Sequence, residues 1–490
     1  MSTELWTAGE AVHHLAQQKP DEVVVICARD SGGADELTRA ELDSWTNRLA
    51  HRMIEQGVGT GEFVAIILPN CIEHVVATMA AYKAGGTPMP VSYSMPSEER
   101  DGLLGLANPR CIVSDQDDLD AITRAEMHAL DAYPDELPTG RVSNPLKALG
   151  SGGSTGKPKL IVSPGEFRFP PGEYPMAALL RFEPGDLKYS PGPLYHNGPF
   201  FFSIIMLFHG GRILLNERFR VGRMLDLIEE YRPTMLNLVP TMMQRMLREP
   251  DIQARDLSSV RMLWHLAAPC PEWAKRGCID LFGPEKIMEL WGATESTGVT
   301  TIDGNEWLAH PGSVGRGVMT EFRIVDEDRN ELPPGEVGEI FSRFGDGTPA
   351  YQYLGAKPLD ELDDGYRSVG DLGYLDEEGY LYLSDRRTDM IISGGANVFP
   401  AEVEAVISSH PKVQDVAVVG LADDDLGRRV HAVVEPRDAN DPPDIADLEA
   451  LCLKDLTRYK VPRAFEIVAQ LPRNEAGKIR RMALREERGG

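Results

Sequence analysis

The chain is short of positive charge. Its 490 residues hold 50 lysines and arginines against 76 aspartates and glutamates, which gives a formal net charge of −26. Proteins that bind nucleic acid through its phosphates need the opposite sign, so the composition argues against DNA and RNA as partners. The last forty residues reverse this balance locally, with ten lysines and arginines against five aspartates and glutamates. That feature suits either a small anionic ligand or a solvated tail.

Membrane spans, close cysteine pairs and a leader pattern are missing as well. The longest apolar stretch, residues 200–208, is far shorter than the ~20 residues that cross a bilayer, and we expect it in a core or a substrate wall. None of the six cysteines lies at CxxC spacing, which disfavours a zinc or redox site. The first residues, MSTELWTAGEAVHHL, lack the basic region and apolar run of a signal peptide, so we expect a cytoplasmic protein.

A chain of 490 residues exceeds what one hydrophobic core usually supports, so we expect two or more domains. Residues 63–68 read as a buried strand, a helical spacing follows until Gly85, and a second apolar run covers 87–91. Residues 224–232 again predict a helix, and residues 235–239 again predict a strand. This order predicts α/β layers with a parallel sheet in the first two-thirds of the chain.

The pattern changes near Ser313. Short alternating runs at 321–325, 338–342 and 380–383 predict small antiparallel sheets or a barrel. A helix at 401–409 and strands at 416–419 and 430–434 then predict a compact α+β domain. The charged run around residues 385–389 is the expected boundary, which gives domains at 1–385 and 386–490.

The segment SGGSTGKPK, residues 151–159, is typical of a phosphate-binding loop. Its glycines let backbone N–H groups approach an anion, while Lys157 and Lys159 supply charge. A Walker-type loop needs Ser or Thr directly after its lysine, and here Pro158 follows Lys157, so ordinary P-loop chemistry is disfavoured. The alternative is a flexible Gly/Ser surface turn.

The segment WGATES, residues 291–296, combines groups that suit a nucleotide. Trp291 can stack on a purine, Thr294 can donate to a phosphate oxygen, and Glu295 can hold Mg²⁺, which prefers oxygen ligands. A structural turn is an equally simple explanation for such a short segment.

Three later clusters are weaker signals. Asp371 follows a glycine and can accept hydrogen bonds from ribose hydroxyls, and Arg386 follows a strand. The pair Gly394 and Gly395 precedes a helix and can line a narrow channel. Lys478 lies in a polar loop near the end of the chain. Taken one at a time, such residues are usually just solvated.

The order of these segments is more specific than any one of them. SGGSTGKPK, PLYHNGP, WGATES, SVGDLG, SDRRTDMIISGGANVFPAEVE and PRNEAGKIRR succeed one another in a way that resembles the acyl-adenylate-forming superfamily of acyl-CoA synthetases, peptide-synthetase adenylation domains and luciferases. The resemblance covers essentially the whole chain. HLAAPCPEWAKR, EWLAHPGSVGR and ISGGANVFPAEVEAV look most like stand-alone bacterial acid–CoA ligases, including those for bile and steroid acids.

The resemblance implies a fold and a set of site residues. The implied fold is an α/β protein with two α/β subdomains and a distorted β-barrel in a large N-terminal domain, followed by a small mobile α+β C-terminal domain. The implied catalytic residues are Lys478, Thr294, Glu295 and His196, with Glu295 also the Mg²⁺ ligand. The implied ATP-binding residues are Ser151, Gly152, Gly153, Ser154, Thr155, Gly156, Lys157, Lys159, Trp291, Gly292, Asp371, Arg386, Gly394 and Gly395.

The reaction that the resemblance implies is the ATP-dependent conversion of a hydrophobic carboxylic acid to acyl-AMP with release of pyrophosphate, followed by transfer to coenzyme A. The alternative acceptor is the amine of an amino acid. Thr388 stands where the family's hinge usually has Asp or Lys, so either the domain rotation is tuned differently or the second half-reaction differs. A nucleotide-binding regulator without chemistry is a third hypothesis.

Overall fold

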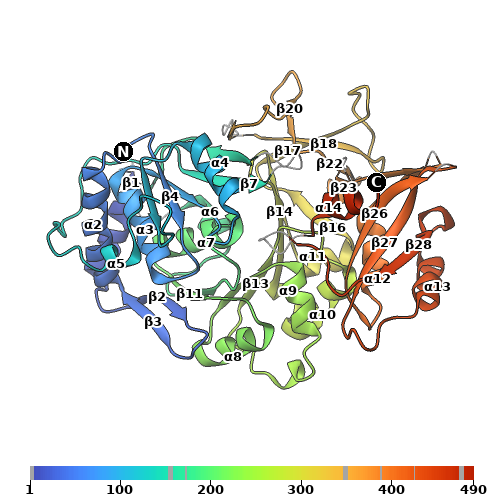
Figure 1. Ribbon diagram of the computed structural model, residues 1–490, viewed down its shortest axis with the longest axis horizontal. Helices are drawn as coiled ribbons and strands as arrows, with labels where there is room; N and C mark the ends of the chain where they lie inside the picture. The colour runs from blue at the N-terminus through green and yellow to red at the C-terminus, as the bar shows by residue number, and fades with distance from the viewer. Residues whose placement is uncertain are drawn as a thin grey trace. The chain divides into compact units, whose positions relative to one another are not determined.

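The computed structural model describes residues 5–152, 158–170, 174–345, 351–386, 389–394, 396–423, 425–473 and 479–489. The chain separates into two compact units. Figure 1 labels their helices and strands. Unit 1 comprises Met1–His265, Thr294–Ser296 and Thr348–Pro358, and unit 2 comprises Leu266–Ala293, Thr297–Gly347 and Leu359–Gly490.

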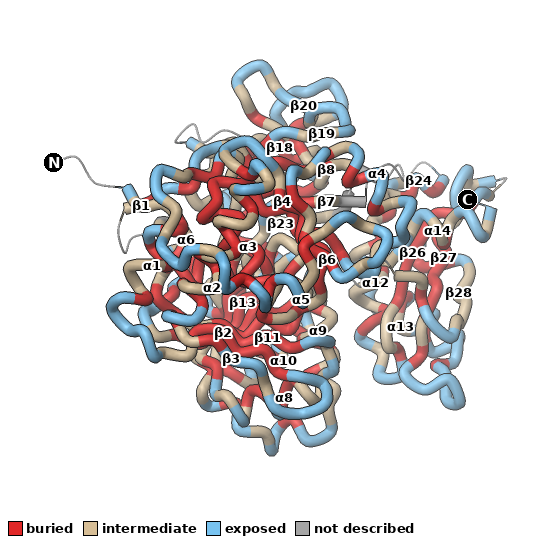
Figure 2. The backbone as a smooth tube through the Cα atoms, turned by 60° about the vertical axis from the view of Figure 1, so that its left-hand side comes forward, coloured by how far each residue is buried: buried red, intermediate tan, exposed pale blue. Residues whose placement is uncertain are grey.

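The main sheet of unit 1 has the strand order β3-β2-β11-β10-β12-β13. Every neighbouring pair is parallel except β2 with β3. The strands are β2 (Val23–Ala28), β3 (Ala34–Thr38), β10 (Leu187–Tyr189), β11 (Arg212–Asn216), β12 (Met235–Leu238) and β13 (Met262–His265). Helix α7 (Asn197–Phe208) connects β10 to β11, and α8 (Val221–Tyr231) connects β11 to β12. The predicted parallel α/β layer is therefore confirmed, and its parallel strands β2, β10, β11, β12 and β13 are almost wholly buried (Figure 2).

A second parallel sheet in unit 1 has the order β5-β4-β6. Its strands are β4 (Phe63–Ile67), β5 (Thr87–Pro90) and β6 (Cys111–Ser114). Helix α3 (Ile72–Ala84) joins β4 to β5 and ends at Gly85, whose φ of 82° is easily reached only without a side chain. The β–α–β unit predicted over residues 63–91 is confirmed.

A three-stranded antiparallel sheet, β19-β8-β7, carries the segments that matter for the site. Strands β7 (Lys147–Gly152) and β8 (Pro158–Ser163) form a hairpin. Strand β19 (Gln352–Leu354) adds to β8 with Tyr353 opposite Ile161. Tyr353 and Lys159 therefore lie two positions apart on adjacent strands, on the same face of the sheet.

Unit 2 contains an antiparallel sheet with the order β20-β21-β18-β22-β23-β16-β15-β14, and β17 also pairs with β18. Its strands are β14 (Ile287–Gly292), β15 (Val299–Asp303), β16 (Ser313–Gly317), β17 (Thr320–Val325), β18 (Gly338–Phe344), β20 (Asp360–Glu361), β21 (Arg367–Ser368), β22 (Asp371–Leu375) and β23 (Leu381–Arg386). The predicted antiparallel strands are confirmed. Within the described parts of the unit they form an open sheet, however, and the expected barrel is not closed.

The end of the chain, also in unit 2, folds as a three-stranded sheet with helices. Strands β26 (Val413–Asp423) and β27 (Gly427–Pro436) are antiparallel, and β28 (Ala464–Ile467) is parallel to β27. Helices α12 (Pro400–Ser408), α13 (Ile445–Asp455) and α14 (Arg481–Glu487) accompany them. The predicted α+β pattern is confirmed. A domain boundary at residues 385 and 386 stays a prediction.

The remaining helices of unit 1 are α1 (Ala8–Gln18), α2 (Arg39–Glu55), α4 (Ser97–Ala107), α5 (Arg124–Met127), α6 (Pro175–Leu179) and α9 (Pro240–Leu247). Those of unit 2 are α10 (Glu272–Phe282) and α11 (Gly304–Ala309). Of the helices in the described ranges, none has both the length and the apolar character to cross a membrane.

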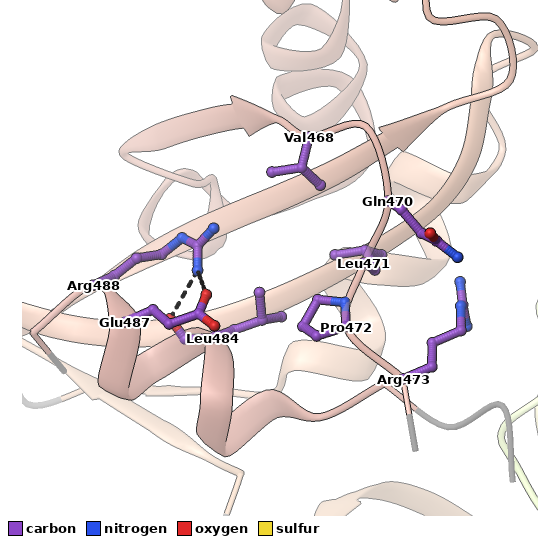
Figure 3. Close-up of a pocket in the computed structure, with 8 residues that line it drawn as sticks. All are labelled: Val468, Gln470, Leu471, Pro472, Arg473, Leu484, Glu487 and Arg488. Atoms are coloured by element: carbon purple, nitrogen blue, oxygen red, sulfur yellow. Dashed lines mark hydrogen bonds and ion pairs between the residues drawn. The ribbon is translucent and has the colours of Figure 1, made fainter. Parts of the chain in front are cut away.

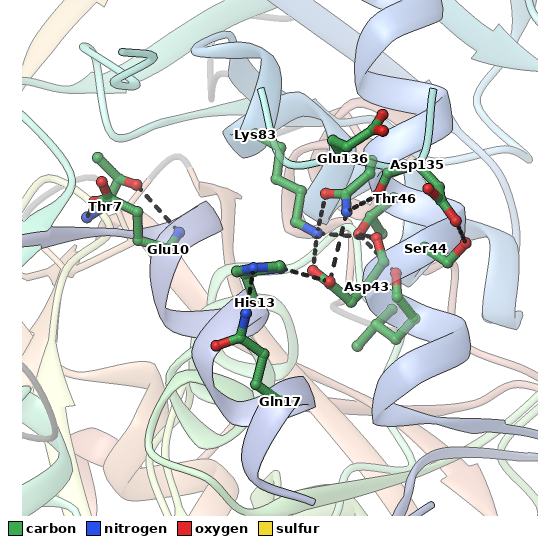
Figure 4. A network of polar contacts seen from close by, with 12 residues as sticks. Thr7, Glu10, His13, Gln17, Asp43, Ser44, Thr46, Lys83, Asp135 and Glu136 are labelled. Atoms are coloured by element: carbon green, nitrogen blue, oxygen red, sulfur yellow. Dashed lines mark hydrogen bonds and ion pairs between the residues drawn. The ribbon is translucent and has the colours of Figure 1, made fainter. Parts of the chain in front are cut away.

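A buried polar network ties α1, α2 and α3 together (Figure 4). The Lys83 ammonium donates to Asp43 Oδ1 at 2.5 Å and to Asn47 Oδ1 at 2.7 Å, and His13 Nδ1 lies 2.8 Å from Asp43 Oδ2. Burial lowers the pKa of Lys83 to about 8, although Asp43 works against that shift. Removing either Lys83 or Asp43 should lower the free energy of unfolding strongly, because the remaining partner would be a buried charge without a counter-charge.

Lys147 and Lys188 are also buried, but the contacts described for them include no carboxylate. Lys188, in β10, donates to Ser203 Oγ at 3.1 Å. Burial alone lowers its pKa from 10.5 to about 7. Between these two pH values the unfolded chain holds the proton more tightly than the folded chain, so folding becomes more favourable as the pH rises.

We therefore predict that Lys188→Met stabilises the protein below pH 7, and that its advantage shrinks between pH 7 and 10.5 by about 1.4 kcal/mol per pH unit. Melting temperatures of both proteins measured across this range would test it. Lys454→Met is the control, because the Lys454 side chain is 78% exposed and removing it should give no such trend. A difference between Lys188→Met and wild type that does not change with pH would contradict the prediction.

Candidate functional site

The predicted phosphate loop connects the two strands of the β7–β8 hairpin. Ser151 lies opposite Lys159, and Gly152 lies opposite Pro158. A Walker-type loop instead leads from a strand into a helix. Because the loop here leads into strand β8, the expected departure from that motif is confirmed. Five of the predicted loop residues lie outside the described ranges: Gly153, Ser154, Thr155, Gly156 and Lys157.

Glu295 and Thr294 lie in the connection between the antiparallel strands β14 and β15. Trp291 and Gly292 are the last residues of β14. A Cβ atom at Gly292 would come within 3.3 Å of the Gly298 carbonyl oxygen, so the two ends of this connection approach closely. The strands thus present Thr294 and Glu295 at the tip of a hairpin.

Glu295 meets Lys159 and Tyr353 in unit 1. Tyr353 Oη lies 2.6 Å from Glu295 Oε1 and 3.0 Å from Lys159 Nζ. Lys159 Nζ lies 3.8 Å from the same Oε1 atom and 4.3 Å from the centre of the Tyr353 ring. The structure therefore brings together a predicted phosphate-binding lysine and the predicted metal-binding carboxylate. Tyr353 was not predicted, because a lone tyrosine in a short strand carries no chemical signature.

In unit 2, the residues predicted for adenine and ribose also meet. Trp291 Nε1 donates to Asp371 Oδ2 at 3.2 Å, and the Trp291 ring packs against Phe322 with centroids 5.9 Å apart. Asp371 begins β22 and lies directly opposite Arg386, the last residue of β23. Three predicted nucleotide contacts thus share one region of the sheet, and their roles stay predictions.

His196 occupies the N-cap position of α7, and Asn70 holds the segment before it. Asn70 Nδ2 donates to the Gly192 and Asn216 carbonyl oxygens, both at 3.1 Å, and Asn70 Oδ1 accepts from the Leu194 N–H at 2.8 Å. Asn70 is only 6% exposed. Sequence reasoning missed this residue, since its partners are more than a hundred residues away.

Lys147 lies at the start of β7, the strand that leads to the phosphate loop. Its ammonium donates to Asn197 Oδ1, next to His196, and lies 4.0 Å from the Phe201 ring centre. Burial lowers the pKa of Lys147 to about 7. The apolar stretch 200–208 is the largely buried part of helix α7. The amine of Lys147 lies at the first turn of this helix.

Gly394 has a local structural explanation. It follows β24 (Ile391–Ser393) and precedes β25 (Ala396–Val398), in a tight turn with φ of 57°. Its N–H donates to the Leu426 carbonyl oxygen at 2.9 Å. A role in lining a channel stays a prediction. Gly395, Thr388 and Lys478 lie outside the described residues, and the side chain of Arg386 is likewise not described.

A groove of about 420 Å³ opens in the C-terminal part of unit 2 (Figure 3). It is lined by Val468, Gln470, Leu471, Pro472, Arg473, Leu484, Glu487 and Arg488. Arg473 pairs with Asp415 at 2.6 Å, and Arg488 pairs with Glu466 at 2.7 Å. Both guanidinium groups in the groove are therefore already neutralised, which weakens the case for it as an anion site.

A divalent cation at Glu295 would need ligands that the described side chains do not supply. No group of three His, Cys, Asp or Glu residues in these ranges is arranged to hold a metal ion. This fits Mg²⁺ that arrives with a nucleotide, because Mg²⁺ is commonly bound by one or two carboxylates together with substrate phosphates and water.

Comparison with known proteins gives two family matches. Residues 12–348 match the AMP-binding enzyme family, and residues 402–478 match the AMP-binding enzyme C-terminal domain. The 2-succinylbenzoate–CoA ligase of Bacillus licheniformis is 27% identical over 480 residues, which cover 96% of this chain and 98% of that one.

Solved structures match over nearly the full length. The o-succinylbenzoate CoA synthetase (MenE) of Bacillus subtilis with the acyl-adenylate OSB-AMP has a TM-score of 0.84 and 26% identity, covering 99% of both chains. The same enzyme with ATP and a magnesium ion has a TM-score of 0.82 and 26% identity, covering 98% of this chain and 100% of that one. The amide bond synthetase McbA of Marinactinospora thermotolerans has a TM-score of 0.76 and 25% identity, covering 98% and 100%.

We predict that Asn70→Ala loosens the segment before His196. The substitution leaves buried backbone groups without partners, at a cost of about 1–3 kcal/mol for each such group. The melting temperature should fall by several degrees, and the Leu194 amide should exchange faster in hydrogen–deuterium exchange. Asn70→Asp should be no better than alanine, because it turns a donor into an acceptor that faces two carbonyl oxygens. Unchanged protection of the Leu194 amide in Asn70→Ala would contradict this role.

Proposed function

Since the chain belongs to the AMP-binding enzyme family, we propose that it activates a hydrophobic carboxylic acid with ATP and transfers the acyl group to coenzyme A. The observation that carries the proposal is the meeting of Lys159 with Glu295, a cation from the glycine-rich hairpin and a carboxylate suited to a nucleotide-bound metal. Full-length similarity to a CoA ligase supports the choice of acceptor.

The chemical problem explains the use of ATP. A carboxylate is a poor acyl donor, because its leaving group would be an oxide. Attack of a carboxylate oxygen on the α-phosphorus forms the mixed anhydride with AMP and breaks the bond to pyrophosphate, which leaves. The thiol of coenzyme A then attacks the acyl carbon and loses its proton, and AMP departs as a stable anion. The products are the thioester, AMP and pyrophosphate.

In the first step, different residues of the chain would bind different parts of ATP. The glycine-rich hairpin with Lys159 would hold the β- and γ-phosphates, and Thr294 would donate to a phosphate oxygen. Trp291 would lie against adenine, and Asp371 would accept from the ribose. Glu295 would hold Mg²⁺, which when bound neutralises charge on the triphosphate.

Lys478 would place its cation between the substrate carboxylate and the α-phosphate, where negative charge concentrates during attack. His196 would line the junction of the acyl and CoA sites. The separate match of residues 402–478 to a C-terminal domain supports a division into 1–385 and 386–490, with rotation of the second part between half-reactions.

We place this activity in the cytoplasm. All six cysteines are free, as a reducing compartment allows. Burial raises the pKa of the Cys278 thiol to about 12, so this thiol is inert.

Amide formation with an amino acid is the second candidate, because an amide bond synthetase matches 98% of this chain. Thr388 also favours this candidate, because it departs from the Asp or Lys usual at the family's hinge and the second half-reaction follows the hinge rotation. Pyrophosphate release and product mass, measured over a panel of aryl, alicyclic and fatty acids with ATP and Mg²⁺, would separate the candidates. Thioester with coenzyme A alone is the expected product. Amide with amino acids alone would favour the second candidate, and ADP with orthophosphate would contradict both.

Lys478→Ala should slow acyl-AMP formation by about 10²–10³-fold, because a preorganised contact to developing charge is lost. Thiolysis of acyl-AMP supplied from outside should be much less affected. Single-turnover experiments measure the rates of acyl-AMP formation and of thiolysis separately in Lys478→Ala and wild type. The control is Lys454→Ala, which removes an exposed lysine of α13 and should change neither step. Equal damage to both half-reactions in Lys478→Ala would show that the role is misassigned.

A further inference from the structure

Tyr353 lies between two groups of opposite charge, and the chemistry of its partners fixes the direction of both hydrogen bonds. A lysine ammonium can only donate, so Tyr353 Oη accepts from Lys159 Nζ at 3.0 Å. The hydroxyl proton is then directed to Glu295, whose Oε1 lies at 2.6 Å. The three groups form one chain of donors that ends on the carboxylate, and such chains strengthen each of their bonds.

The tyrosine is held in place by the backbone as well as by its hydroxyl. Strand β19 pairs with β8, with Tyr353 opposite Ile161 and Leu354 opposite Leu160. Lys159 belongs to the same β8 strand, so the two residues share a rigid support. Glu295 instead lies in the connection between β14 and β15, outside the paired residues of both strands.

From this geometry we propose that Tyr353 is a positioning residue for the divalent-cation site, acting through Glu295. The inference rests on the proposed function, since that function brings the cation with ATP. Both contacts described for the Glu295 carboxylate, with Tyr353 and with Lys159, fall on Oε1. Tyr353 therefore fixes one oxygen of the carboxylate, and Oε2 is the oxygen that would be available to a cation.

The size of the effect can be judged from what outer partners of metal ligands do elsewhere. They orient the ligand, and their loss typically costs 10–100-fold in metal affinity. Tyr353→Phe removes only the hydroxyl and keeps the ring against which Lys159 lies, 4.3 Å from its centre. The variant should therefore weaken the cation's contribution to nucleotide binding and leave the lysine's contribution nearly intact.

The experiment uses Mn²⁺ as a spectroscopic substitute for Mg²⁺. Binding of Mn²⁺·ATP to the full chain is followed by electron paramagnetic resonance, and binding of ATP in EDTA by calorimetry. Tyr353→Phe should bind Mn²⁺·ATP about 10–100-fold more weakly than wild type. Its affinity for ATP in EDTA should change less than threefold. In a Glu295→Gln background, adding Tyr353→Phe should cause no further loss of Mn²⁺·ATP affinity.

The chain offers a matched control in Tyr366. Its hydroxyl lies 2.7 Å from Glu321 Oε2, and its ring lies 4.3 Å from the Arg323 guanidinium carbon. Tyr366→Phe thus removes a tyrosine–glutamate contact of the same kind outside the predicted site. It should leave Mn²⁺·ATP affinity unchanged.

Wild-type affinity for Mn²⁺·ATP in Tyr353→Phe would overturn the proposal, and so would an equal loss of ATP binding with and without metal. If Tyr353→Phe does not fold, Tyr353→His takes its place, because its shorter ring cannot span both partners. Since it also removes the ring beside Lys159, it should weaken Mn²⁺·ATP binding more than ATP binding in EDTA, and equal losses would overturn the proposal. Pyrophosphate release by the wild-type protein distinguishes failure of the positioning role of Tyr353 from failure of the proposed function. If wild type releases pyrophosphate while Tyr353→Phe binds Mn²⁺·ATP normally, only the positioning role fails; if no acid elicits pyrophosphate from wild type, the proposed function fails.

Discussion

The contact between the Glu295 carboxylate and Lys159, 3.8 Å apart, is the interaction on which the proposed function depends. In that proposal the carboxylate shares a metal with a triphosphate and so has to lie beside the loop that would hold the phosphates. Three segments far apart in the chain meet at Glu295: the β7–β8 hairpin, the connection after β14, and strand β19.

The scaffold around the site carries polar groups that a purely structural core would avoid. Lys83 is paired with Asp43 and ties three helices, whereas Lys147 and Lys188 are buried with only neutral contacts described. Asn70 donates to the backbone carbonyl oxygens of Gly192 and Asn216 and accepts from the Leu194 N–H. Lys147 and Lys188 contact residues of helix α7, and Asn70 holds the segment that leads into it.

Much of the fold could be predicted from local patterns, because periodicity and glycine placement act over short distances. Residues 63–91 show this, since an apolar run, a helical spacing and Gly85 were enough to give β4, α3 and β5. The meeting of Trp291 with Asp371 needed the family resemblance, because the two residues are 80 positions apart. Tyr353 and Asn70 could not be found, since only the folded chain brings them to their partners. Both the alternating runs after Ser313 and the resemblance allowed a barrel, but the described strands form an open sheet.

The account rests on one covalent event, the joining of an acid to AMP, and the path of a single oxygen atom reports it. An acid that supports pyrophosphate release is labelled with ¹⁸O in its carboxylate and turned over with ATP and coenzyme A. Mass spectrometry of the nucleotide product gives the result. The account predicts that AMP carries one labelled oxygen from the acid. Unlabelled AMP, or label found in orthophosphate, would contradict it.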